Sequence, residues 1–331
     1  MARAQTGSCE TIVALDLSDT LVVAISSTAL FDLEESQRLF ERERQSDPDR
    51  AIESYRAHML AHEDEPLPAG TGLPLARALL RLNAFAENGR RPLVEVVVMS
   101  RNSPETGLRV LHNIRHQQLA ISRSAFTGGE SVVDYLAAFG VDLFLTTNAE
   151  DARRVIDSRV CAAAIVAAPP PEIERLPDDQ VRIAFDGDAV LFDESSELVY
   201  KREGLAAFHD AERSAEDTPL AEGPYANLLK KIAHLQDRLP GRVEYSPIRI
   251  AIVTARNSPA DVRVIKTLRE WGVYVDEAFF LGGVDKSQVL AAFKPHIFFD
   301  DQDVHLDAAS PLVPAGKVPY RSDSPLARSG K

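Results

Sequence analysis

The sequence predicts an α/β protein built from two Rossmann-like halves, each a parallel sheet flanked by helices. One reason is that strands apolar along their whole length alternate with helices, which is typical of a parallel sheet covered on both faces. The other is that long sequence segments recur in the same order: Val94–Ile114 matches Ile248–Leu268, and Ala125–Asn148 matches Phe279–Gln302. This period is too long for a solenoid unit, so it indicates an internal duplication.

The predicted boundary between the halves is a Pro-rich, acidic segment at residues 167–180, a composition that suits a linker. We therefore expect a first half at residues 1–170 and a second half at residues 171–331. The tail after Pro311 is rich in Pro, Ser and Gly. It is expected to hold a last short strand at residues 317–320 and then to end loosely.

Each half repeats the same order of elements. An apolar strand is followed by a helix-rich polar stretch and by a second, β-branched strand. An Arg-Asn-Ser-Pro turn then opens a helix with apolar residues at helical spacing, and a short strand, a Gly-Gly turn, a helix and a last strand close the unit. The first and second strands are expected at residues 22–26, 94–99, 182–185 and 249–253, and the apolar helix positions are Val262, Ile265 and 268–271.

Composition limits the class of partner. The chain of 331 residues is 45% hydrophobic and carries a net charge of −13, which argues against nucleic acid or an anionic membrane as the main partner. A small anionic ligand fits, because it responds to local charge and bound metal. Cys9 and Cys161 make no disulfide framework. With no signal peptide or membrane span apparent, we expect a cytoplasmic protein, and homo-oligomer formation stays open.

Polar residues follow the strands of the second half, where ligands bind in open parallel sheets. Taken singly, each has an ordinary explanation as a turn former, a helix cap or a surface charge. Taken together, four carboxylates at two strand ends would repel one another unless a cation lay between them. The residues are Asp186 and Asp188 after the first strand, Thr254 after the second, Lys286 at a helix start, and Asp300 and Asp301 after the last strand.

An all-oxygen set of this kind suits Mg²⁺, which keeps several waters and takes one or two carboxylates plus substrate oxygens. The cation would offset the repulsion between a carboxylate nucleophile and a phosphate dianion. One aspartate could then attack phosphorus, and a second could protonate the leaving oxygen and later deprotonate water. Thr254 and Lys286 would hold the equatorial oxygens, where charge gathers in the transition state.

The order Asp-x-Asp, Thr, Lys, Asp-Asp resembles the haloacid dehalogenase superfamily. Longer segments are similar to the cytosolic 5'-nucleotidase I family, among them "AFDGDAVLFDESSE", "VTARNSP" and "KPHIFFDDQDVH". The similarity covers nearly the whole chain. The resemblance implies a Mg²⁺-dependent enzyme that hydrolyses nucleoside 5'-monophosphates to nucleoside and phosphate through an aspartyl phosphate. One departure is "LFDESSE", in which Asp193 is shifted by one place relative to the wording that is frequent in the family.

Carried over by position, the resemblance makes Asp186 the nucleophile and Asp188 the general acid and base. Asp300 and Asp301 become metal ligands or their direct support, and the backbone carbonyl of Asp188 a further ligand. The implied metal set is thus Asp186, Asp188, Asp300 and Asp301, and the implied substrate contacts are Thr254, Ala255, Arg256, Asn257, Lys286, Phe208 and Lys201.

The resemblance also implies a small helical cap at about residues 193–247, inserted after the first strand of the second half. Such a cap would exclude water and help to select the leaving group. Phe208, Tyr225 and Lys201 are its candidates for contact with a base or ribose. Core packing for the two aromatic residues and a solvated charge for the lysine are the favoured alternatives.

The first half lacks the chemistry of the second. Hydroxyl or apolar residues stand where the second half has its carboxylates and its lysine, so we expect a half that keeps the fold without the reaction. The replacements are Ser26 and Thr28 for the Asp-x-Asp pair, Met99 for Thr254, Val132 for Lys286, and Thr146 and Thr147 for the Asp-Asp pair.

Three further patterns are interpreted as structural. Asp16 and Asp19 are three residues apart, which places them on opposite faces of a strand. The histidine pairs 58/62 and 112/116 have metal-ligand spacing, but no third ligand is apparent beside either, so a solvated helix face is favoured. Two alternatives to the nucleotidase remain: a phosphatase of the same chemistry for another small phosphate ester, and a non-enzymatic nucleotide sensor that uses the first half.

Overall fold

The computed structural model describes residues 16–87, 91–171, 173, 176, 179–241 and 246–329. Cys9 and parts of the predicted linker lie outside them, and Cys161 is a free thiol. The strands of the first half are β1 (Leu21–Ile25), β2 (Val94–Ser100), β3 (Arg123–Phe126), β4 (Leu143–Thr146) and β5 (Ala162–Val166). Those of the second half are β6 (Val181–Phe185), β7 (Ile248–Thr254), β8 (Glu277–Phe280), β9 (Ile297–Asp300) and β10 (Ala315–Lys317).

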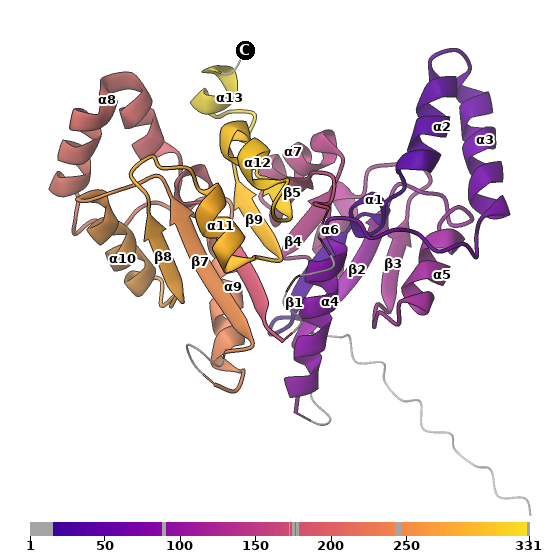
Figure 1. The fold of residues 1–331 in the computed structure, drawn as a ribbon, viewed down its shortest axis with the longest axis horizontal. Coiled ribbons are helices and arrows are strands. Elements are labelled where there is room, and N and C mark those ends of the chain that lie inside the picture. Colours follow the sequence, from indigo (N-terminus) through magenta and orange to yellow (C-terminus); the bar gives the residue numbers. More distant parts are fainter. Residues whose placement is uncertain are drawn as a thin grey trace, which may run out of the picture.

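All ten strands belong to one sheet, in the order β3-β2-β1-β4-β5-β10-β9-β6-β7-β8 (Figure 1). Neighbours are parallel except β5 and β10, which pair antiparallel where the halves meet. The expectation of a separate sheet in each half is therefore corrected. Pairing β5 with β10 covers two strand edges that would otherwise offer unpaired backbone groups.

Helices cover the sheet and extend from its ends. In Figure 1, α2 and α3 rise at one side of the molecule and α8 rises at the other. The first-half helices are α1 (Ser27–Leu30), α2 (Glu34–Arg44), α3 (Pro48–Ala61), α4 (Leu73–Arg81), α5 (Leu108–His116), α6 (Leu136–Phe139) and α7 (Ala149–Ser158). The second-half helices are α8 (Ser195–Ser214), α9 (Ala226–Asp237), α10 (Ala260–Glu270), α11 (Ser287–Phe293), α12 (Asp303–Ala309) and α13 (Pro325–Ser329). None of the described helices is long and apolar enough to cross a bilayer.

One large hydrophobic cluster spans both halves, and each half also has a smaller cluster of its own. A single buried cluster contains Ile25 and Leu79 from the first half together with Phe185, Leu229 and Ile252 from the second. Helix α4 contacts β6, and helix α9 contacts β1, so each half covers the first strand of the other. Burial of these apolar side chains is the main force that holds the halves together.

The predicted strands are confirmed, with ends that differ by one residue at most. Two of the apolar residues at helical spacing in α10 do not belong to its buried face, because Val262 and Ile265 are 37% and 48% exposed. The buried face is formed by Ala260, Val264 and Leu268, which also recur at helical spacing. Two overlapping apolar stripes run along this helix, and contact with the sheet decides which one is buried.

The expectation of a loose C-terminal end is corrected as far as residue 329, and residues 330–331 lie outside the described residues. Strand β10 begins two residues before the predicted strand, and Val318 and Leu326 beyond it are buried. The Tyr320 hydroxyl donates a hydrogen bond to Asp301, and the Ser324 hydroxyl donates one to Glu194. These contacts fix the segment after β10 against the carboxyl end of β9.

Two glycines lie against backbone at matching places in the halves. A Cβ on Gly223 would come within 2.3 Å of the carbonyl oxygen of Phe192, and a Cβ on Gly70 within 2.6 Å of that of Ala29. Each glycine follows a residue in an isolated antiparallel bridge, Ala69 with Phe31 and Glu222 with Phe192. The close approach leaves no room for a side chain.

Gly223→Ala is therefore expected to lower the free energy of unfolding by about 1–3 kcal/mol, because the new methyl group must push backbone aside. Urea unfolding followed by circular dichroism measures the change. Ala221→Ser, at an exposed position in the same loop, is the matched control and should unfold as the wild type does. An unchanged midpoint for Gly223→Ala would contradict the close approach.

Candidate active site

Three carboxylates meet where β6 and β9 end. The backbone N–H of Asp186 donates to the carbonyl of Phe299 at 2.8 Å, so Asp186 lies beside Asp300 and Asp301 at the end of β9. All three residues are buried, and each offers a carboxylate oxygen within 4.8 Å of the others. Parallel strands bring their carboxyl ends to one edge of the sheet, which is why residues far apart in sequence meet here.

Lys286 supplies a positive charge to this cluster. It lies at the start of α11 and is 1% exposed. Its Nζ is 2.8 Å from Oδ1 of Asp186 and 2.7 Å from Oδ2 of Asp300. One ammonium thus contacts two of the three buried carboxyl groups, and the cluster is left short of positive charge.

That shortage changes the proton affinity of the carboxyl groups. Burial raises the pKa of Asp186 to about 6, Lys286 opposes the rise, and the charge of Asp300 adds to it. Burial also raises the pKa of Asp300 and of Asp301. For Lys286, burial alone would lower the pKa, but the Asp186 and Asp300 carboxylates raise it above its ordinary value. Carboxyl groups that hold protons so readily would exchange them for a bound cation.

The donor set fits a hard divalent cation. One oxygen of Asp301 accepts a hydrogen bond from Tyr320, while Oδ1 is buried without a hydrogen-bond partner. An unpartnered buried carboxylate oxygen is costly unless it has a ligand to bind. Because carboxylate oxygens are the ligands that small divalent cations prefer, Asp186, Asp300 and Asp301 form a candidate metal site.

The side chain of Asp188 takes a different direction. Its two oxygens accept hydrogen bonds from Nε and Nη2 of Arg256 at 2.8 and 2.6 Å, and it is not part of the three-carboxylate cluster. Ala189 has a φ of 58°, a left-handed conformation that is uncommon for a residue with a side chain. This tight turn sends Asp186 and Asp188 to separate partners.

The turn after β7 lies next to the Asp-Gly-Asp turn. Thr254 is buried, and a Cβ on Gly187 would be 3.2 Å from its hydroxyl oxygen. Ala255 is exposed, Arg256 is buried, and Oδ1 of Asn257 lies 2.9 Å from Nε2 of His209 on α8. The structure thus brings Thr254 beside the Asp-Gly-Asp turn and joins Arg256 and Asn257 to α8.

The residues of the predicted cap have mixed environments. The ring of Phe208 is buried, and the Arg256 guanidinium lies 5.5 Å from its centroid. Lys201 is exposed, and its Nζ is 2.7 Å from Oε1 of Glu197. Tyr225 is fully buried against Phe299 and is a core residue. Helix α9 also packs its apolar face into the core, so α8 is the part of this segment that lies over the sheet edge.

Comparison with known proteins gives a clear relationship. A family model described as "5'-nucleotidase" matches residues 13–325. The chain belongs to the 5'-nucleotidase family. It is 33% identical over 300 residues to cytosolic 5'-nucleotidase 1B of Homo sapiens, covering 89% of this chain and 48% of the human protein. The chain therefore spans about half the length of that relative, and no solved structure matches it. The predicted resemblance to the cytosolic 5'-nucleotidase I family is confirmed.

Two buried glutamates beside this candidate site were not predicted. Glu212 on α8 accepts hydrogen bonds from Arg256 at 2.7 Å and from Arg263 at 3.0 Å. Glu197, also on α8, accepts one from Gln302 at 3.2 Å, and burial raises its pKa. Sequence reasoning missed them because glutamates in a polar helix are usually solvated.

The corresponding edge of the first half contains hydroxyl groups. Ser26 donates its backbone N–H to Leu145 at 2.8 Å, as Asp186 does to Phe299. The hydroxyl of Thr28 is 3.1 Å from that of Ser26 and 2.6 Å from that of Thr147. These hydroxyl groups form hydrogen bonds with one another, and no carboxylate takes part in these bonds.

The other predicted patterns lie away from the acid cluster. Asp16 forms an ion pair with Arg91 on the surface at 2.6 Å. The expectation that no further ligand lies beside either histidine pair is wrong for His112, whose Nδ1 is 2.7 Å from Asp64, with Glu63 nearby. The loop after α3 turns back onto α5 and brings them together. Asp64 is mostly exposed, which fits an ordinary solvated ion pair.

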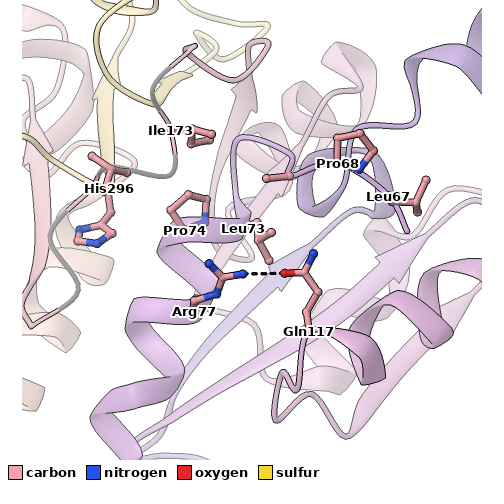
Figure 2. A pocket seen from close by; sticks show the side chains of 10 residues that line it. Leu67, Pro68, Leu73, Pro74, Arg77, Gln117, Ile173 and His296 are labelled. Atoms are coloured by element: carbon pink, nitrogen blue, oxygen red, sulfur yellow. Dashed lines mark hydrogen bonds between the residues drawn. The ribbon is translucent and has the colours of Figure 1, made fainter. Parts of the chain in front are cut away.

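A separate cavity of about 140 Å³ lies between the predicted linker, α4 and the start of β9 (Figure 2). Apolar groups from Leu73, Pro74 and Ile173 line it, and Arg77 donates a hydrogen bond to Gln117 at 2.6 Å at its edge. None of the acid-cluster residues contributes to its walls.

The acid cluster gives a pH-dependent prediction. Because the folded-state pKa of Asp186 is raised to about 6, the folded protein binds more protons than the unfolded one between the ordinary carboxyl range and pH 6. Stability of the metal-free protein should therefore fall as pH rises through this window. Added Mg²⁺ should raise the melting temperature more at pH 7.5 than at pH 5, since protons no longer compete for the oxygens.

Differential scanning calorimetry with Mg²⁺ or with a chelator tests this prediction. Asp186→Asn should lose most of the difference between the two pH values, whereas Asp64→Asn on the surface should retain it. A Mg²⁺ effect that is equal at both pH values would contradict Asp186, Asp300 and Asp301 as metal ligands.

Proposed function

We propose that this chain is a Mg²⁺-dependent 5'-nucleotidase that hydrolyses nucleoside 5'-monophosphates to nucleosides and inorganic phosphate. The observation that carries the proposal is the buried cluster of Asp186, Asp300 and Asp301 around Lys286, in a chain of this family. The name of the human relative supports the substrate class, the type of reaction and a cytoplasmic location. Asp186, Asp300 and Asp301 would hold Mg²⁺, which would neutralise phosphate charge when bound.

The first step transfers the phosphoryl group to the protein. A carboxylate oxygen of Asp186 attacks phosphorus, and the bond between phosphorus and the nucleoside 5'-oxygen breaks. Asp188 gives its proton to that oxygen, so the nucleoside leaves as a neutral alcohol. An aspartyl phosphate on Asp186 results. Lys286, whose Nζ is 2.8 Å from Asp186, would hold a phosphoryl oxygen together with the Thr254 hydroxyl.

The second step releases phosphate. Asp188, now ionised, takes a proton from a water molecule, which attacks phosphorus. The bond between phosphorus and the Asp186 oxygen breaks, so the carboxylate is regenerated and the proton balance of the cycle closes. Two carboxyl groups with different partners suit these two roles, because Asp186 faces Lys286 and Asp188 faces Arg256.

The division of labour between halves is part of the proposal. Residues 171–331 would form the catalytic, haloacid dehalogenase-type half, and residues 1–170 a non-catalytic half of the same duplicated origin. The mirrored strand order and the matching glycines support duplication. The paired hydroxyl groups around Thr28 support the loss of metal binding in the first half. Helix α8 would act as the cap, with Phe208 and Lys201 as candidate substrate contacts.

Phosphate release from a panel of ribo- and deoxynucleoside monophosphates, with Mg²⁺ or with a chelator, tests the function. Asp186→Asn supplies the blank. We expect Mg²⁺-dependent release from nucleotides in preference to sugar phosphates. Faster release from a sugar phosphate would favour the alternative small-ester phosphatase. Nucleotide binding without release from any ester would favour the sensor.

A further inference from the structure

The Arg256 side chain is buried between two aromatic rings and two carboxylates. Its side chain is 1% exposed, and the Phe208 and Phe192 ring centroids lie 5.5 and 5.9 Å from its guanidinium carbon. Nε and Nη2 donate to Asp188, and Nη1 donates to Glu212 at 2.7 Å. Each of the three guanidinium nitrogens thus donates a hydrogen bond to a carboxylate. A residue so enclosed is poorly placed to bind a phosphate, although its position in the Thr-Ala-Arg-Asn turn suggested a substrate contact.

We propose that Arg256 is a positioning residue, which holds the Asp188 carboxylate in the orientation needed for proton transfer and anchors it through Glu212 to helix α8. The proposal rests on the nucleotidase function above, in which Asp188 is the general acid and base. A guanidinium that meets a carboxylate with two parallel hydrogen bonds fixes the plane of that carboxylate. Each oxygen of Asp188 keeps a further lone pair for the transferred proton.

The anchor on α8 is itself well braced. Glu212 is buried and also accepts hydrogen bonds from the Ser196 hydroxyl at 2.7 Å and from Arg263 at 3.0 Å. Two guanidinium groups therefore balance the carboxylates of Asp188 and Glu212. Burial alone would lower the pKa of Arg256, but these two carboxylates raise it, so its charge is secure.

A bend in α8 makes this anchor possible. Gly204 has a φ of 84° and interrupts the helix between Ser196 and Glu212. The bend turns the second part of α8 back, so that Phe208, His209 and Glu212 all reach the turn after β7. Proton transfer by Asp188 is thereby linked to the docking of α8 over the sheet edge.

The first half provides an internal comparison. Arg101 occupies the corresponding Arg-Asn turn, but Thr28 stands where the second half has Asp188. Arg101 instead donates to Asp151 on α7 at 2.8 and 2.6 Å, and it is more exposed than Arg256. The turn keeps an arginine in both halves, and its carboxylate partner changes with the local residues. Contact with the general acid is therefore specific to the second half.

Leaving-group dependence separates positioning from substrate binding. p-Nitrophenolate departs from phosphorus without a proton, whereas a nucleoside needs one. For Arg256→Gln, we expect kcat with a nucleoside monophosphate to fall by about 10²-fold with KM nearly unchanged, because the acid is misplaced. With p-nitrophenyl phosphate, a rapid burst of p-nitrophenolate should remain, followed by slow turnover, since only the second step still needs Asp188.

Arg256→Lys keeps the charge but not the two-pronged geometry and should recover little activity. Arg101→Gln, in the equivalent turn of the first half, is the matched control and should behave as the wild type. A different result would identify Arg256 as a phosphate ligand and overturn the proposal. In that case Arg256→Gln would show a large rise in KM for both substrates and no burst, and Arg256→Lys would recover activity. Wild-type kinetics for Arg256→Gln would overturn it as well.

Glu212→Gln keeps the result interpretable if Arg256→Gln does not fold. It leaves both hydrogen bonds between Arg256 and Asp188 in place and weakens only the anchor, so it should show the same burst with a smaller loss of kcat. The absence of any effect would contradict the link to α8. Failure of the nucleotidase function itself would look different, because the wild type would then release no phosphate.

Discussion

Asp186→Asn is expected to lower kcat for phosphate release by roughly 10⁴-fold or more, because no neighbouring group can replace a missing nucleophile. The folded structure should persist. An amide has nearly the volume of the carboxyl group, and it removes one charge from a buried cluster that is short of cations. The loss of activity should therefore come without a loss of stability.

Phosphate release with saturating Mg²⁺ and nucleotide, together with a melting curve of the same sample, tests both parts. Asp188→Asn is the informative comparison, since it keeps the nucleophile and removes proton transfer, with an expected loss of about 10²–10⁴-fold. Substantial activity in Asp186→Asn would place the nucleophile elsewhere and undo the role given to the second half.

Lys286→Met is expected to have the largest effect on stability. It would leave Asp186 and Asp300 buried with no cation near them, and removal of one partner from a buried ion pair costs about 3–5 kcal/mol. Activity should be lost as well, because the phosphoryl oxygens lose a positive charge. The destabilisation should be greatest in chelator and smaller with Mg²⁺, which would replace part of the missing charge.

Urea unfolding of Lys286→Met, Asp300→Asn and the double variant measures this coupling. The double variant should be more stable than Lys286→Met alone, because it removes the charge of Asp300, one of the two buried carboxylates that lose their cation. It should remain inactive. Lys266→Met, at a surface lysine paired with Glu216, is the matched control and should cost little. Additive effects of the two active-site changes would argue against a direct Lys286–Asp300 pair.

The sequence was sufficient for the strands and for the acid cluster. Apolar runs of strand length identify β6, β7 and β9 without knowledge of the rest of the chain. The carboxyl ends of neighbouring parallel strands lie at the same edge of the sheet. Asp186, Asp300 and Lys286 could therefore be placed together in advance. Because the same framework recurs with Ser26 and Thr147 in the first half, the acids could be recognised as dispensable to the fold.

The partners of Arg256 could not be predicted in the same way. A buried ion pair leaves no periodic signal, and Glu212 lies in a helix whose other charges are mostly solvated. The bend at Gly204 also changes which side of α8 faces the sheet. The burial of Val264 in place of Val262 has a similar cause, since contact with the strands selects between two possible apolar faces.

The pairing of β5 with β10 has the geometry of a twofold dimer interface contained in one chain. The last strand of the first half, β5, runs antiparallel to the last strand of the second half, β10. Helix α4 of the first half contacts β6 of the second, and helix α9 of the second half contacts β1 of the first. An interface of this kind uses the same patch on both partners. The first half would therefore act as a permanently tethered subunit. Substitutions at its strand ends should be tolerated, whereas substitutions along β5 should disturb the second half as well.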